Sequence, residues 1–108
     1  MNDTLDLSYL KSLMANDETL VLKFVNIFKS QCPRQLQELK LHLQNEDWQN
    51  LSTVAHSMKT QFTYLNVGFL ATQASDIECM VDEGRTENLT ERIHSFETAC
   101  QRLLDSVV

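Results

Sequence analysis

The chain of 108 residues has few of the residues that interrupt helices, with only two glycines and one proline. A sheet of several strands needs frequent turns, and Gly and Pro are prominent among the residues that form them. Several stretches of the chain instead repeat apolar residues at alternating steps of three and four, which is typical of amphipathic helices. The sequence therefore predicts an all-α protein.

Positive charge and long apolar runs are also scarce. Nine Lys and Arg residues against fifteen Asp and Glu residues give a formal net charge of −6, and no basic face is apparent. The most apolar run, residues 20–28, is interrupted by Lys23 and Asn26 and falls short of the ~20 residues of a spanning helix. No basic segment followed by an apolar block begins the chain. We therefore expect a cytoplasmic protein with neither nucleic acid nor a membrane as its partner.

The three cysteines, Cys32, Cys79 and Cys100, are odd in number and far apart in the sequence. We interpret them as small buried apolar residues in a reducing compartment, and we expect no disulfide framework. Together with His42 and His56 they lack the spacing of a metal-ligand set, so no metal site is predicted.

The apolar pattern predicts a short helix at residues 5–14 and four longer helices after it. A chain of this length has room for one hydrophobic core, so we expect a single domain over residues 1–108. Its predicted architecture is an antiparallel up-down four-helix bundle at residues 17–107, with an N-terminal cap helix at residues 1–15. The residues expected to line the core are Leu7, Leu10, Leu13 and Met14, then Leu20, Phe24, Ile27, Phe28, Leu36, Leu39 and Leu43, then Trp48, Leu51, Ala55, Met58, Phe62 and Leu65, then Val67, Phe69, Leu70, Ala74, Ile77 and Val81, and last Leu89, Ile93, Phe96, Cys100, Leu103 and Val107.

Polar residues and one proline mark the expected helix ends. We expect Asn16 to cap the long second helix, and Pro33 to bend that helix without breaking it. The segment Asn45-Glu46-Asp47 is expected to supply capping side chains for the next helix, which should start near Asp47 and end near Asn66, a residue that tolerates the left-handed conformation. Thr86 is expected to cap the last helix.

His56 lies on the helix that is expected to start near Asp47, and the helical spacing turns its side chain toward solvent. A neutral imidazole nitrogen is a good nucleophile, and histidine is among the side chains that form covalent intermediates. Lys59, one turn later on the same face, can approach the charge of a phosphoryl group on the ring. His42 and His94 have no comparable surroundings, and we interpret both as structural or incidental.

The sequence around His56 resembles the histidine-containing phosphotransfer (HPt) domain family. The resemblance covers roughly residues 17–105 and is carried by Ala55-His56-Ser57-Met58-Lys59, by Leu65, and by Leu70-Ala71-x-x-Ala74-x-x-Ile77-Glu78. That family has Ala-His-x-Leu-Lys-Gly, a Leu-Gly pair, and Leu-Ala-x-x-Ala-x-x-Leu-Glu. The resemblance implies a phosphoryl carrier without kinase activity of its own, which takes a phosphoryl group from an aspartyl phosphate on a receiver domain and passes it to another receiver.

The same resemblance implies roles for individual residues and partners. His56 would accept the phosphoryl group, most simply through Nε2, and Lys59 would neutralise its charge. Glu78 would orient the imidazole by accepting a hydrogen bond from Nδ1–H. The partners implied are response-regulator receiver domains and a hybrid sensor kinase; we expect a monomer without a cofactor, the Mg²⁺ being bound by the receiver. The partner would dock on the residues around the ring, which are Ser52, Thr60, Gln61 and Thr63.

Two departures from the family pattern leave alternatives open. Thr60 replaces the family's Gly and Gln61 its next small residue, which adds bulk beside His56. A bundle that binds receivers through this face without being phosphorylated is therefore a second hypothesis. Residues 56–60 also resemble the H-box of sensor-kinase dimerisation domains, but Ser57 stands where that motif has an acidic residue and Gln61 stands where it has Pro. Four bundle helices are also expected here in place of a two-helix hairpin, so the kinase interpretation is the weaker one.

Overall fold

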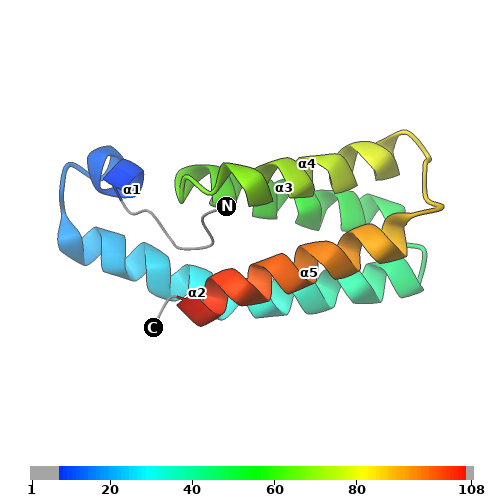
Figure 1. Cartoon of the computed structure of the whole chain (residues 1–108), viewed down its shortest axis with the longest axis horizontal. Helices are drawn as coiled ribbons and strands as arrows, with labels where there is room; N and C mark the ends of the chain where they lie inside the picture. Colours follow the sequence, from blue (N-terminus) through cyan, green and yellow to red (C-terminus); the bar gives the residue numbers. More distant parts are fainter. Residues whose placement is uncertain (1–7, 107–108) are drawn as a thin grey trace.

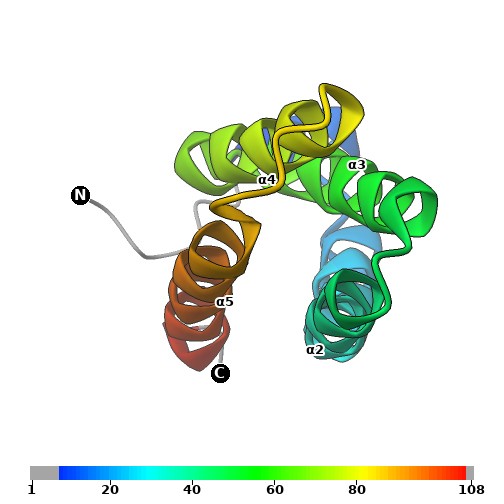
Figure 2. The ribbon, with the colours of Figure 1, turned by 90° about the vertical axis from the view of Figure 1, so that its right-hand side faces the viewer.

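The structure, a computed structural model, describes residues 8–106, which form five helices. These are α1 (Ser8–Leu13), α2 (Glu18–Gln44), α3 (Trp48–Tyr64), α4 (Gly68–Asp82) and α5 (Leu89–Ser106). The described residues contain no strand, so the prediction of an all-α protein is confirmed. The four longer helices lie around a common core (Figure 2), and α1 lies beside the first turns of α2 at one end of the molecule (Figure 1). The predicted core residues Leu7 and Val107, and the side chain of Leu10, lie outside the described residues.

The residue that caps α2 is Asp17, so the prediction of Asn16 was wrong by one position. The Asp17 carboxylate accepts hydrogen bonds from the backbone N–H groups of Thr19, at 3.0 Å, and Leu20, at 3.2 Å. Asn16 instead ends α1, because its φ of 61° is left-handed and its N–H donates to the Lys11 carbonyl at 2.7 Å. An asparagine suits either position, and the tight turn between α1 and α2 assigns it to the first helix.

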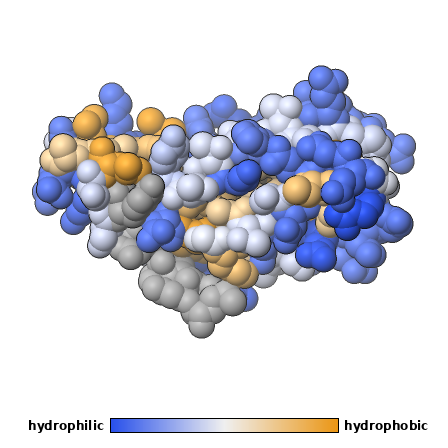
Figure 3. Space-filling model, turned by 90° about the horizontal axis from the view of Figure 1, so that it is seen from above, coloured by the Kyte–Doolittle hydropathy of each residue, from blue (hydrophilic) through white to orange (hydrophobic). Residues whose placement is uncertain are grey.

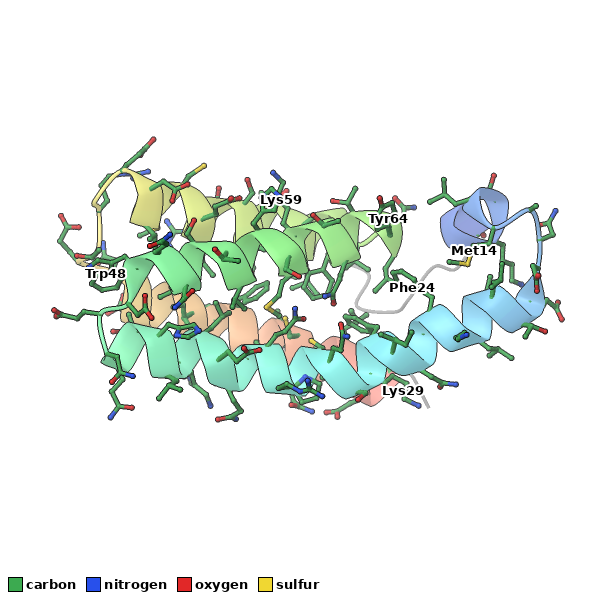
Figure 4. All side chains as sticks on the ribbon, turned by 180° about the vertical axis from the view of Figure 1, so that it is seen from behind. Met14, Phe24, Lys29, Trp48, Lys59 and Tyr64 are labelled. Carbon is green, nitrogen blue, oxygen red and sulfur yellow. The ribbon has the colours of Figure 1, made fainter. Side chains whose placement is uncertain are left out.

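Pro33 lies inside α2, which continues without interruption from Glu18 to Gln44. Proline removes one backbone hydrogen bond and crowds the carbonyl four residues earlier, which belongs to Lys29. The ribbon of α2 changes direction in the region of Lys29 (Figure 4). The prediction of a helix that continues through the proline is therefore confirmed.

The ends of α3 lie where the sequence predicts them. The Asp47 carboxylate accepts from the Asn50 side-chain amide at 2.7 Å and from the Asn50 backbone N–H at 3.4 Å. These two hydrogen bonds stabilise the ionised form and lower the pKa of Asp47. Asn66 follows the helix with a left-handed φ of 57°, which turns the chain into α4 within a few residues.

The core is formed by apolar side chains of α2, α3, α4 and α5, and the described residues include no buried polar side chain. The Phe62 ring lies between the rings of Phe28 and Phe96, at centroid distances of 5.6 and 5.9 Å, in edge-to-face contacts. Cys32 and Cys100 are also fully buried. The pKa of the Cys100 thiol is raised mainly by its burial, and also by its contact with Cys32. The Cys100 thiol therefore stays protonated, and both buried cysteines pack as small apolar groups.

Several residues that were predicted to be buried are exposed. In the first half of α2 the core is formed by Val21, Val25 and Phe28, whereas Leu20 and Ile27 are each 47% exposed. The apolar surface of this half-helix is wide enough for two parallel stripes, which are displaced by one residue in the sequence. The rest of the bundle covers the stripe of Val21, Val25 and Phe28 and leaves that of Leu20 and Ile27 exposed. The other exposed residues of this kind are Leu13, Phe69 and Cys79, for which burial was also a wrong prediction.

Candidate functional site

His56 projects from the middle of α3 with 59% of its side chain exposed. Its neighbours Ala55 and Met58 are buried in the core, so the backbone of this turn is held against the bundle while the imidazole faces outward. The helical spacing predicts this orientation. A ring in this position is fixed at its base and open to a second protein.

The imidazole of His56 is paired with a carboxylate from the next helix. The Nδ1 atom lies 2.9 Å from Oε2 of Glu78, whose side chain is only 19% exposed. A carboxylate can only accept, so Nδ1 carries the proton, and in the neutral ring Nε2 then carries the free lone pair. Ser52 lies one turn before His56 on α3 and Asp82 lies one turn after Glu78 on α4, and the Ser52 hydroxyl donates to the Asp82 carboxylate at 2.7 Å. Two polar contacts therefore join α3 to α4 at the level of His56.

A third contact holds the other side of the same turn. The Gln35 side-chain amide on α2 donates to the Ser57 hydroxyl at 3.3 Å. Sequence reasoning missed both Gln35 and Asp82, because each lies on another helix and outside the recognised motif. In the sequence, each is only a polar residue next to the apolar stripe of its helix. Such residues are common on amphipathic helices, so they do not indicate a site.

The remaining predicted site residues lie along α3. Lys59 is half-buried one turn after His56 (Figure 4), and its ammonium group forms no ion pair with any described residue. Thr60 and Thr63 are exposed, but their hydroxyls donate to the backbone carbonyls of His56, at 3.2 Å, and Lys59, at 2.8 Å. The hydroxyl groups expected to face a partner are thus already engaged by the helix.

An apolar groove adjoins this face between α2 and α3. Gln61 lines it on α3 together with Phe24, Ile27, Phe28 and Gln31 of α2, and the volume of the groove is about 70 Å³. Beside it the ring of Tyr64, which is 46% exposed, contacts Phe24 edge to face at a centroid distance of 6.4 Å (Figure 4). The groove places Ile27, which belongs to the uncovered stripe of α2, beside Gln61 of α3.

The other histidines have different surroundings. Nδ1 of His42 lies 3.9 Å from the Asp47 carboxylate at the start of α3, and His94 is an exposed residue of α5. Within residues 8–106, no group of three or more His, Cys, Asp or Glu side chains is arranged to hold a metal ion. None of the helices in this range is long and apolar enough to cross a membrane.

The fold and the site define a class of protein, a helical bundle that presents one exposed, carboxylate-oriented imidazole. Residues 23–106 match the Hpt domain family, and the chain belongs to this family. Hpt domains carry out histidine phosphotransfer in phosphorelays, as phosphocarriers and not as kinases, and they interact with receiver domains and kinases of two-component systems. Comparison with curated proteins and with solved structures gave no significant match.

Proposed function

We propose that this protein is a histidine phosphotransfer intermediate in which His56 accepts a phosphoryl group from a receiver-domain aspartyl phosphate and passes it to another receiver. The observation that carries the proposal is the pairing of an exposed imidazole with Glu78 at 2.9 Å. This contact leaves Nε2 as the nucleophilic atom. The proposed partners are receiver domains and a hybrid sensor kinase, with Mg²⁺ held by the receiver.

The transfer step follows from the tautomer of His56. The Nε2 lone pair forms the new N–P bond while the P–O bond to the aspartyl oxygen breaks, and its electron pair returns to the receiver's carboxylate. The proton stays on Nδ1, so the ring becomes positively charged as the bond forms. The Glu78 carboxylate is already in place to stabilise that charge, which is the electrostatic arrangement that speeds such a step.

This role of Glu78 predicts a slower transfer in the Glu78→Gln variant. The amide oxygen can still accept from Nδ1–H, but a neutral partner in place of a charged one removes on the order of 1 kcal/mol, equivalent to roughly fivefold in rate. Transfer from a phosphorylated receiver, followed by quenched-flow labelling, measures it. Asp82→Asn is the matched control, because this carboxylate contacts Ser52 and not the ring, and equal rates in both variants would refute the role of Glu78.

For Lys59 we propose that the free ammonium group neutralises the phosphoryl charge. Lys59→Ala should leave the helix content unchanged and slow transfer or shorten the lifetime of the phosphohistidine by a few-fold, the size expected for a partly exposed charge pair. Lys23→Ala, which changes an exposed lysine of α2, is the control. Identical kinetics for Lys59→Ala and the wild type would contradict the assignment.

The proposed docking face consists of Ser52, Thr60, Gln61 and Thr63 around the ring. Incubating the protein with a phosphorylated receiver and Mg²⁺ should place an acid-labile label on it.

Thr60 and Gln61 add bulk beside His56, which supports one alternative function. In this alternative the bundle binds receivers without accepting the phosphoryl group, and docking without label would favour it. We propose a monomer, and a dimeric mass in solution would instead favour a kinase dimerisation fragment.

A further inference from the structure

The exposed threonines of α3 all turn their hydroxyl groups back onto their own helix. Thr53, Thr60 and Thr63 each donate to the backbone carbonyl four residues earlier, at 3.0, 3.2 and 2.8 Å. A hydroxyl has one proton to donate, and here it is already used. These residues are polar by type, but their donor groups do not face the solvent.

The geometry of the threonine side chain decides what faces outward instead. The Cβ atom carries the hydroxyl, the methyl group and a hydrogen in staggered positions, so a hydroxyl directed at the helix places the methyl in a different position. Because Thr60 and Thr63 are exposed, a partner that covers this face meets their methyl groups. The surface beside His56 is therefore more apolar than its sequence suggests.

Thr60 lies in a row of side chains on α3 whose surroundings change from polar to apolar along the helix. Ser52, His56, Thr60 and Tyr64 follow one another at steps of four, which places them in one row on the helix surface. The row is polar at Ser52, which donates to Asp82 at 2.7 Å, and apolar at Tyr64, which contacts Phe24. In Figure 3 hydrophobic surface gathers toward the end of the molecule that carries α1, and the opposite end is mostly hydrophilic. In this row Thr60 lies between the ring of His56 and the apolar residue Tyr64.

We propose that Thr60 is a specificity-determining residue that contacts the receiver through its methyl group and not through its hydroxyl. The receiver selected in this way presents an apolar side chain against Thr60, on the side of its aspartate that lies toward Tyr64. A receiver with a polar or charged side chain there would leave that group desolvated against the methyl and would bind more weakly. This inference rests on the proposed function, since it names the chemistry of the partner at the same site.

Two substitutions of Thr60 separate the contribution of the methyl group from that of the hydroxyl. Thr60→Val keeps a methyl group and removes the hydroxyl, whereas Thr60→Ser keeps the hydroxyl and removes the methyl. For a receiver that phosphorylates the wild type, Thr60→Ser should weaken docking by about fourfold, the equivalent of one buried methyl group. Thr60→Val should keep the affinity of the wild type. The dissociation constant is measured by calorimetry with the receiver, and the transfer rate is measured in parallel.

Thr98 provides the matched control. It is an exposed threonine of α5, and its hydroxyl donates to the His94 carbonyl at 3.1 Å in the same way. Thr98→Val and Thr98→Ser should both bind the receiver like the wild type. Thermal unfolding of all four variants verifies that differences in docking do not come from loss of the helix, since Val, Ser and Thr have similar helix propensities.

The opposite order of effects would overturn the proposal. If Thr60→Val weakens docking and Thr60→Ser does not, the hydroxyl makes the contact; if neither has an effect, Thr60 lies outside the interface. A wild type that neither docks nor becomes labelled with any receiver would overturn the proposed function itself. Binding and labelling of the wild type are measured before any variant is compared. Failure of the proposed function is therefore distinguished from failure of the inference about Thr60.

Discussion

His56→Gln is expected to abolish phosphoryl transfer to this protein while leaving its fold intact. Gln has no nucleophilic ring nitrogen, so no N–P bond can form. The side chain is 59% exposed, and no core residue depends on it for packing. The expected result is loss of the acid-labile label to background, with unchanged circular dichroism and an unchanged unfolding temperature.

The other two histidines make the result specific. His42→Gln and His94→Gln should accept label at the rate of the wild type, because neither ring has the exposed, carboxylate-paired setting of His56. Label that persists in His56→Gln and disappears in one of these variants would move the phosphorylation site. Receiver binding without label in the wild type would instead support the binding-only alternative.

Phe62→Ala is expected to have the largest effect on stability. Phe62 is fully buried, and its ring contacts Phe28 of α2 and Phe96 of α5, so it joins three helices. Removing a buried phenyl ring from a close-packed core typically lowers the free energy of unfolding by about 3–5 kcal/mol. Urea unfolding followed by circular dichroism measures the change.

Phe69→Ala is the matched control for this prediction. Phe69 belongs to the first turn of α4 and is 37% exposed. Its truncation should cost well under half of the loss expected for Phe62→Ala, because much of its surface already contacts water. Similar losses in the two variants would mean that the three-helix contact of Phe62 does not stabilise the core.

Much of α3 could be predicted from the sequence because its signals are local. The Asp47 cap depends on a residue three positions later, and the left-handed Asn66 depends on the turn that immediately follows the helix. The outward direction of His56 follows from the helical repeat once the apolar stripe is known. The family match over residues 23–106 confirms the resemblance that this motif carries.

The errors at the start of α2 and in its first half occurred where two local solutions were equally good. Both Asn16 and Asp17 can cap a helix, and the first half of α2 offers either Leu20 and Ile27 or Val21 and Val25 to the core. A rotation of the helix about its axis exchanges these two sets at little local cost. Only the positions of α3 and α5 against α2 decide between them.

The sequence by itself determined that the chain is helical, where α3 begins and ends, and that His56 faces outward, because each depends on neighbours within a few residues. Tertiary structure decided the rest: the 2.9 Å contact between His56 and Glu78, the hydrogen bond from Gln35 to Ser57, and the stripe of α2 that remains uncovered. Each of the two hydrogen-bonded contacts joins residues that are 22 positions apart and lie on different helices, and the uncovered stripe depends on how α2 is rotated against its neighbours. The family resemblance implied the pairing of His56 with Glu78, but the distances themselves are set by how whole helices pack against one another.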